Sequence, residues 1–251
     1  MSYNDYHMTL TVLLAANLEL FLLIGQSNMA GRGQVEPADR EPIPRVLALG
    51  KDGEWAPAVE PVHFDKPYAG SGLARSFAKT LAEANPAASI GLIPCAVGGT
   101  GLSEWKPGGK LYSDALERAR IAMKSGRLRA ILWHQGESDS GDEKLAGTYR
   151  ERWSEWIRSL RQDLGDPDVP VIVGQLGEFF AKENGGNSPF ARVVNEQLAV
   201  LPLYVRHTAF VSSAGLTHKG DRVHFDRTSL RELGRRYALA YLSLDPEWAA
   251  K

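Results

Sequence analysis

Residues Leu18 to Gly33 have the sequence LELFLLIGQSNMAGRG, and they give the strongest indication of the fold. It begins with an apolar run that carries one charge, Glu19, and this run ends at Gly25. A run of this kind next to a glycine is typical of a strand buried on both faces, as in a parallel sheet covered by helices. In such a sheet the ligand crevice lies beyond the carboxyl ends of the strands, which is where Ser27 and Asn28 fall.

Ser27 has two interpretations. As a helix cap, its side chain would accept a hydrogen bond from one of the first N–H groups of a following helix. As a nucleophile at a strand-to-helix turn, it would attack a carbonyl carbon while those same N–H groups bind the oxyanion. Taken alone, this stretch favours the cap, so the rest of the chain has to decide.

Length and composition indicate one globular α/β domain over residues 1–251, long enough to bury a sizeable core. Apolar residues make up 43% and charged residues 24%, with a formal net charge of -1, so no nucleic-acid partner is expected. The single cysteine, Cys95, excludes an intrachain disulfide and a multi-cysteine metal site. The scattered histidines lack ligand spacing, so we expect no metal.

The N-terminal stretch Met8 to Ala16, MTLTVLLAA, resembles the apolar part of a secretory signal. It lacks a preceding lysine or arginine, and its apolar character continues into the first predicted strand. Asn17 and Glu19 interrupt the run before it reaches the length of a membrane span. We therefore expect a soluble protein without membrane contact, with the cytoplasm favoured and secretion as the alternative.

Apolar runs alternate with amphipathic stretches along the rest of the chain, which predicts a three-layer α/β/α sandwich around a parallel sheet of about five strands. The predicted strands are the run from 18 and residues 89–97, 128–133, 169–176 and 205–211. The predicted helices are residues 73–84, 111–124, 142–164, 190–201 and 229–242. The proline-rich segment 34–70 is predicted to be an irregular insertion that shapes the binding site, with one short strand at 45–49.

Polar or glycine-rich clusters follow four of the predicted strands. They are GQSN at 25–28, GGTG at 98–101, HQGESD at 134–139 and DRVHFD at 221–226. Since active sites in this architecture gather groups from several strand ends, each cluster is a candidate part of an acyl-transfer site.

Each cluster offers a different chemical group. Asp221 could hold one ring nitrogen of His224 and leave the other free as a general base, or the two could be a surface pair beside a helix start. Gly99 could present its N–H to an oxyanion, or lie in a plain tight turn. The Gln135 amide is a candidate for a further oxyanion donor.

The charged residues after the third of these strands have several candidate roles. Glu137 and Asp139 could hold the loop, bind Arg32, or orient His224. His134 is predicted to be structural rather than catalytic.

Together these motifs resemble the SGNH hydrolase superfamily. In particular they resemble the acetylesterases of carbohydrate esterase family 6, which include acetylxylan esterases, and the sialate O-acetylesterase-like domain. The carrying residues are GQSNMAGRG at 25–33, GGTGLSEW at 98–105, WHQGESD at 133–139 and DRVHFD at 221–226, in the family order over about residues 19–241. The resemblance implies a flavodoxin-like fold and a reaction without cofactor or metal.

The resemblance also implies the roles of single residues. Ser27 would be the nucleophile, His224 the general base and Asp221 the acid. The Ser27 N–H, Gly99 and Gln135 would form the oxyanion hole. The serine block is GQS where many SGNH enzymes have GDS, and Gln135 stands where they have Asn. Both departures favour the carbohydrate branch of the superfamily. In that branch Glu137 remains an alternative partner for His224.

The implied activity is hydrolysis of O-acetyl groups from a carbohydrate through an acetyl-enzyme, with acetylated xylan or xylo-oligosaccharides as substrate. The alternatives are a sialate O-acetylesterase, a generic short-chain carboxylesterase and, in another class, a non-catalytic carbohydrate-binding protein. Trp105 is predicted to stack on a sugar ring, with a core position as the alternative. Arg32 is predicted to pair with Glu137 or Asp139, joining the first and third strand ends.

Overall fold

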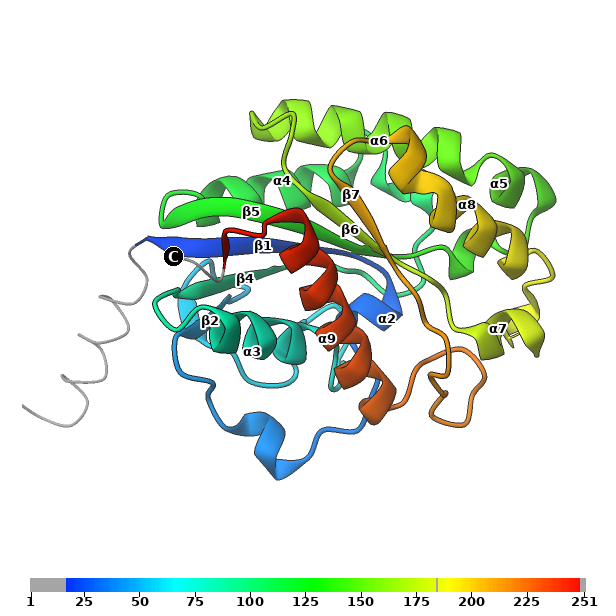
Figure 1. Ribbon diagram of the computed structural model, residues 1–251. Helices are drawn as coiled ribbons and strands as arrows, with labels where there is room; N and C mark the ends of the chain where they lie inside the picture. Colours follow the sequence, from blue (N-terminus) through cyan, green and yellow to red (C-terminus); the bar gives the residue numbers. More distant parts are fainter. Residues whose placement is uncertain (1–16, 184, 249–251) are drawn as a thin grey trace, which may run out of the picture.

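The computed structural model describes residues 17–183 and 185–248. In this part of the chain, a seven-stranded sheet lies between two layers of helices (Figure 1). The strand order is β3-β2-β4-β1-β5-β6-β7. All neighbouring strands are parallel except β3, which runs antiparallel to β2 at the edge of the sheet. The predicted three-layer α/β/α sandwich is confirmed. Residues 8–16, on which the signal-peptide question depends, lie outside the described residues.

The strands are β1 (Leu18–Gly25), β2 (Val46–Leu49), β3 (Trp55–Pro57), β4 (Ile90–Pro94), β5 (Gly126–His134), β6 (Val171–Gly174) and β7 (Thr208–Val211). The α-helices are α2 (Ser27–Ala30), α3 (Ala74–Ala84), α4 (Lys110–Ala122), α5 (Glu143–Gly147), α6 (Tyr149–Leu164), α7 (Glu178–Lys182), α8 (Ala191–Tyr204) and α9 (Arg227–Leu244). Short 3-10 helices are η1 (Pro37–Arg40), η2 (Leu102–Trp105), η3 (Glu137–Asp139) and η4 (Gly185–Asn187).

Strand β1 is the centre of the fold, as its sequence predicts. It pairs with β4 on one side and β5 on the other, and its residues 20–24 are fully buried. Helices α3 and α9 cover one face of the sheet, while α4, α6 and α8 cover the other (Figure 1). Because both faces are covered, the inner parts of β1, β4 and β6 are continuous apolar runs rather than alternating patterns.

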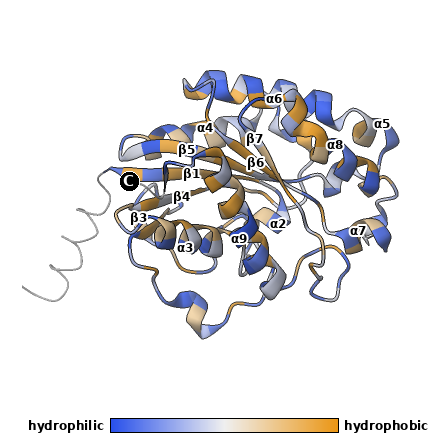
Figure 2. Ribbon diagram, viewed as in Figure 1, coloured by the Kyte–Doolittle hydropathy of each residue, from blue (hydrophilic) through white to orange (hydrophobic). Residues whose placement is uncertain are grey.

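Helix α6 shows how the outer layer is patterned. Much of its ribbon is coloured hydrophilic in Figure 2, yet Trp153, Trp156 and Leu160 recur at helical spacing and are buried. The predicted continuous helix 142–164 is interrupted at Thr148, which separates α5 from α6 with φ -101° and ψ 11°. Gly147 next to this break has a low helix propensity, so interrupting the helix there costs little free energy.

The prediction of about five strands is too low, because segment 34–70 adds two strands to the sheet edge. Strand β2 confirms the short strand predicted at 45–49 and pairs with β4. Strand β3 has three residues, of which two are exposed, so neither its length nor an apolar period distinguishes it in the sequence.

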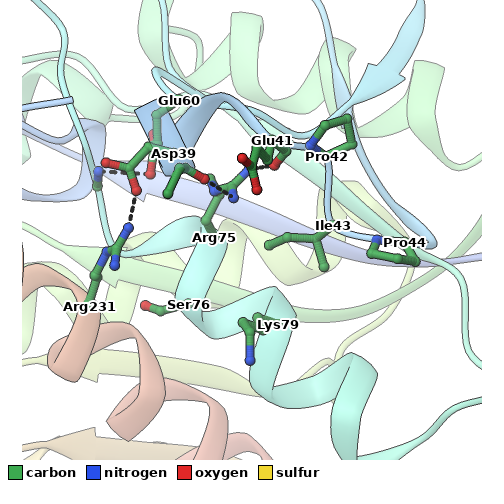
Figure 3. Close-up of a pocket in the computed structure, with 12 residues that line it drawn as sticks. Asp39, Glu41, Pro42, Ile43, Pro44, Glu60, Arg75, Ser76, Lys79 and Arg231 are labelled. Carbon is green, nitrogen blue, oxygen red and sulfur yellow. Dashed lines mark hydrogen bonds and ion pairs between the residues drawn. The ribbon is translucent and has the colours of Figure 1, made fainter. Parts of the chain in front are cut away.

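The beginning of this segment is anchored to α3 and α9 through charged side chains (Figure 3). Asp39 is buried and binds Arg227 and Arg231 of α9, while Arg75 of α3 donates to the carbonyl oxygens of Glu41 and Ala58. Burial alone would raise the pKa of Asp39, but its arginine and backbone hydrogen bonds lower that pKa to about 2. The anchored segment leaves a cavity of about 420 Å³ above α3.

Candidate active site

Three of the four predicted clusters meet because they follow adjacent strands, β4, β1 and β5. Backbone hydrogen bonds continue the sheet register beyond the strand ends. The Val97 N–H donates to the Gly25 carbonyl at 2.9 Å, and the Gln26 N–H donates to the His134 carbonyl at 3.0 Å. The fourth cluster reaches the same place in the loop between β7 and α9, as its contacts with Ser27 show.

Gly25 makes the turn after β1 possible. Its φ is +139°, and a Cβ added there would lie 2.1 Å from the His134 carbonyl oxygen. Only glycine therefore allows β1 and β5 to approach so closely at this point. The turn places Ser27 at the first position of the four-residue helix α2.

Ser27, His224 and Asp221 form one hydrogen-bonded line. The Ser27 hydroxyl oxygen lies 3.0 Å from His224 Nε2, and His224 Nδ1 lies 2.7 Å from Asp221 Oδ2. No side-chain hydrogen bond caps α2, so the interpretation of Ser27 as a helix cap is wrong. Asp221 and His224 do lie beside the start of α9, which Asp226 caps, but His224 also contacts Ser27, so they are more than a surface pair.

Asp221 is held by its own turn as well as by the His224 ring. Its Oδ1 accepts the backbone N–H groups of Val223 at 3.0 Å and His224 at 2.8 Å, and Lys219 lies 3.1 Å from Oδ2. Burial would raise the pKa of Asp221, but these hydrogen bonds outweigh it and hold that pKa far below its ordinary value. The carboxylate therefore stays ionised and favours the tautomer of His224 that carries its proton on Nδ1.

Glu137 reaches His224 only through Asn28. Its Oε1 accepts from the Asn28 amide at 2.6 Å. Asn28 also donates to the Val223 carbonyl and accepts the Phe225 N–H, each at 3.1 Å, so it holds the backbone on both sides of His224. Burial raises the pKa of Glu137 to about 7. No partner of Asn28 is predicted from the sequence, because Val223 and Phe225 lie almost 200 positions away in the chain.

Two backbone N–H groups, those of Ser27 and Gly99, are candidates to bind an oxyanion formed at Ser27. The N–H of Ser27 lies in the first turn of α2, where helices leave their N–H groups without an intrahelical partner. Gly99 is exposed with φ +83°, and a Cβ on the preceding Gly98 would lie 3.4 Å from the Ser27 Cβ. The glycine turn therefore packs directly against the serine, and both N–H groups can serve an oxyanion there.

Gln135 does not reach the surface of this site. It is fully buried, and its Nε2 donates to Asp139 at 2.7 Å, to the Thr100 carbonyl at 3.1 Å and to Gln26 at 3.2 Å. Its Oε1 accepts from the Tyr149 hydroxyl at 2.8 Å. The prediction that Gln135 donates to the oxyanion is wrong in this structure, because its amide already satisfies interior acceptors. It holds the Thr100 end of the glycine turn instead.

The predicted partners of Arg32 are also wrong. Arg32 pairs with Asp65 at 2.7 Å, and Asp139 pairs with Arg152 at 2.8 Å. Asp65 belongs to the 34–70 segment, and no spacing rule connects it with Arg32. Asp65 is thus a second residue at this site that the sequence interpretation missed.

Trp105 belongs to the core. It is 1% exposed, its Nε1 donates to Thr100 Oγ1 at 3.1 Å, and its ring packs edge-on against Trp133 with centroids 5.8 Å apart. The prediction that it stacks on a sugar ring is wrong because neither face is accessible, and the core alternative holds.

His134 is structural, as predicted. It is fully buried, and its Nδ1 lies 3.1 Å from the Tyr237 hydroxyl. Burial lowers the pKa of His134 to about 3, so the ring is neutral under ordinary conditions. Residues 17–183 and 185–248 contain no group of three His, Cys, Asp or Glu side chains placed to hold a metal ion. In the same part of the chain, no helix has both the length and the apolar character needed to cross a membrane.

Comparison with known proteins agrees with the motifs. A family described as carbohydrate esterase, sialic acid-specific acetylesterase, matches residues 17–243. A probable carbohydrate esterase of Arabidopsis thaliana is 34% identical over 245 residues, which covers 90% of both chains. The crystal structure of that plant protein superposes with a TM-score of 0.82 at 32% identity, over 90% of this chain and 98% of the plant chain.

More distant structures share the fold alone. The crystal structure of NanS matches with a TM-score of 0.76 and 18% identity, over 92% of this chain and 98% of the other. An acetylxylan esterase from Geobacillus stearothermophilus matches with a TM-score of 0.51 and 16% identity, over 91% of this chain and 94% of the other. These structures confirm the predicted fold class. The family match and the plant relative confirm the resemblance to carbohydrate esterases.

Proposed function

Because this chain belongs to the carbohydrate esterase family of sialic acid-specific acetylesterases, we propose that it is a serine esterase acting through an acetyl-enzyme intermediate. The observation that carries the proposal is the contact of Ser27 Oγ with His224 Nε2 at 3.0 Å, together with Asp221 at 2.7 Å from the other ring nitrogen. A nucleophile, a base and a group that orients the base are the parts that acyl transfer needs.

The first half of the reaction forms the acetyl-enzyme. Ser27 Oγ attacks the acetyl carbonyl carbon while His224 Nε2 takes the hydroxyl proton, and the negative charge of Asp221 stabilises the resulting imidazolium. The N–H groups of Ser27 and Gly99 bind the tetrahedral oxyanion. When the bond from the acetyl carbon to the sugar oxygen breaks, His224 returns the proton to that oxygen and the sugar leaves as an alcohol.

The second half repeats these steps with water. His224 takes a proton from a water molecule, whose oxygen attacks the acetyl carbon on Ser27. The second tetrahedral intermediate uses the same two N–H donors. Its collapse breaks the bond to Ser27 Oγ, the proton returns to the serine, and acetate is released. Apart from this water molecule, the two half-reactions use only groups of the chain and of the ester.

Acetylated xylan or xylo-oligosaccharides are our first proposed substrates, and the shared fold of the Geobacillus acetylxylan esterase supports them. An O-acetylated sialic acid is the second, and the description of the family supports it. The non-catalytic alternative is disfavoured by the contact of Ser27 with His224, since a binding protein has no need of an oriented base next to a serine.

The test is release of acetate from acetylated xylan, from O-acetylated sialic acid and from p-nitrophenyl acetate, with the wild type beside Ser27→Ala. We expect Ser27→Ala to fold normally and to lose kcat by roughly 10⁴-fold or more. Ser76→Ala is the matched control, because the Ser76 hydroxyl donates to the Leu73 carbonyl in α3 and should not affect turnover. Near-normal activity in Ser27→Ala would exclude this serine as nucleophile. Without serine-dependent acetate release from any substrate, the non-catalytic alternative would replace the esterase.

A further inference from the structure

The loop from Glu60 to Gly72 lies along the segment that follows Ser27. The Gly70 N–H donates to the Gly31 carbonyl at 3.1 Å. Gly33 and Ser71 exchange a pair of backbone hydrogen bonds of 3.0 and 2.8 Å. The loop and the serine segment are therefore joined by their backbones, and a shift of one moves the other.

The buried carboxyl group of Glu60 joins the two ends of this loop. Glu60 is 2% exposed, and its two oxygens accept the N–H groups of Val62 at 3.0 Å and Gly72 at 3.1 Å. Figure 3 shows Glu60 at the inner side of the cavity above α3, behind Asp39. With both ends held by Glu60, the residues between them have a defined position beside the sheet.

Asp65 in this loop accepts a hydrogen bond from the glycine turn, residues 98–101, next to Ser27. Its side chain is 1% exposed, and its Oδ2 accepts both the Gly98 N–H at 2.8 Å and Arg32 Nη2 at 2.7 Å. Burial would raise the pKa of Asp65, but the hydrogen bonds from Arg32 and Gly98 lower it below its ordinary value. Asp65 is therefore a carboxylate, and Arg32 balances its charge.

The ion pair fills the space under Gly98. A Cβ built on Gly98 would lie 2.4 Å from Arg32 Nη2, 3.0 Å from Asp65 Oδ2 and 3.4 Å from Ser27 Cβ. The Arg32 guanidinium is itself held by the Gly31 carbonyl at 2.7 Å. Because the Gly98 N–H points at Asp65, the orientation of the following peptide, which carries the Gly99 N–H, depends on this contact.

We propose that Asp65 is a positioning residue that sets the direction of the Gly99 N–H toward the oxyanion, with Arg32 neutralising its charge. This inference rests on the proposed esterase function. An oxyanion donor acts only if it lies within hydrogen-bond distance of the oxygen in the transition state, and a misplacement of about 1 Å can cost about a hundredfold in rate. A carboxylate without Arg32 would also repel the developing negative charge.

The test compares Asp65→Asn with the wild type on p-nitrophenyl acetate. The variant keeps the shape of the side chain but removes its charge and turns an amide toward Arg32 or Gly98. We expect kcat to fall roughly ten- to a hundredfold while KM changes less than about twofold, because the donor acts in the transition state rather than in substrate binding. Affinity for a phenylboronic acid, whose tetrahedral serine adduct resembles the intermediate, should fall by the same factor as kcat.

Asp245→Asn is the matched control. Asp245 pairs with Arg129 at 3.2 Å, at the opposite end of the sheet from Ser27, so the same chemical change there should leave kcat and boronic acid affinity unaltered. Equal losses in both variants would show a general effect of a broken ion pair and would overturn the inference. A rise in KM at constant kcat would overturn it as well.

A second variant covers the case in which Asp65→Asn does not fold. Arg32→Gln leaves the Asp65 carboxylate next to Gly98 without its counter-charge, and we expect the same loss of kcat and of boronic acid affinity. Unchanged kcat in a folded Arg32→Gln would overturn the inference. Failure of the proposed function is distinguishable, since it would appear in the earlier comparison of wild type with Ser27→Ala, before any Asp65 variant is made.

Discussion

His224 is oriented by two carboxyl groups that act at different distances. Asp221 binds the ring directly, at 2.7 Å from Nδ1. Glu137 binds Asn28, which holds the backbone on both sides of His224. The contact with Asp221 can stabilise the protonated His224 ring, whereas the contact of Glu137 through Asn28 can only fix the position of that ring.

These two routes predict a ranking of variants. Asp221→Asn should lower kcat by roughly 10²–10⁴-fold, because an amide supplies no charge to the imidazolium and can favour the wrong tautomer. Glu137→Gln should lower kcat less, since the glutamine oxygen can still accept the Asn28 N–H. Steady-state rates on p-nitrophenyl acetate measure both. The reverse ranking would transfer the role of the acid to Glu137.

At the scale of elements, the site depends on how closely β1 and β5 approach at their carboxyl ends. Gly25 sits against the His134 carbonyl, and the next two residues turn away from the sheet into α2. The serine is thus presented at a backbone turn whose geometry is set by two strands that are adjacent in the sheet and more than 100 residues apart in the chain.

We predict that Gly25→Ala destabilises the fold by more than about 4 kcal/mol, since the new methyl would lie 2.1 Å from a backbone oxygen. Gly53→Ala is the matched control. Gly53 also has a positive φ, +86°, but no atom lies within 4 Å of its added Cβ, so only backbone strain of about 1 kcal/mol is expected. Unfolding in urea, with solubility as a first readout, compares the two. Equal losses would mean that backbone conformation alone, rather than close approach, requires Gly25.

At the scale of the whole molecule, two buried glutamates hold the segments around the site in place. Burial raises the pKa of Glu60 to about 7 from an ordinary value of 4.5, and Glu137 behaves in the same way. Between pH 4.5 and about pH 7, the native state therefore binds more protons at these carboxyl groups than the unfolded state does. The contribution of each group to the free energy of unfolding therefore falls as the pH rises through this window.

Glu60→Gln tests this linkage. The glutamine does not ionise, so the free energy of unfolding of the variant minus that of the wild type should increase from pH 4.5 to about pH 7 and then stay constant. The slope for one carboxyl group is at most about 1.4 kcal/mol per pH unit. Urea unfolding of both proteins across this range provides the measurement. A difference independent of pH would show that Glu60 ionises normally in the folded protein.

The apolar runs of the sequence predicted the sheet core and the alternation of strands and helices, whereas the line from Ser27 to Asp221 was implied by the resemblance of the motifs to the SGNH hydrolases. Apolar runs report burial locally, and strands that end in the same layer bring their following residues together. The glycine and serine of the first turn, and the three-residue spacing of Asp221 and His224, are local features that can be seen without the rest of the fold.

The partners of the remaining polar groups depend on contacts between segments that are distant in the chain. Arg32 binds Asp65 rather than Glu137 or Asp139, and Gln135 turns inward. Trp105 is covered by the core, and segment 34–70 adds β2 and β3 to the sheet edge. The physical reason is the same in each case: a donor binds whichever acceptor the packing of distant segments leaves beside it, and burial depends on what covers a side chain rather than on its neighbours in the chain.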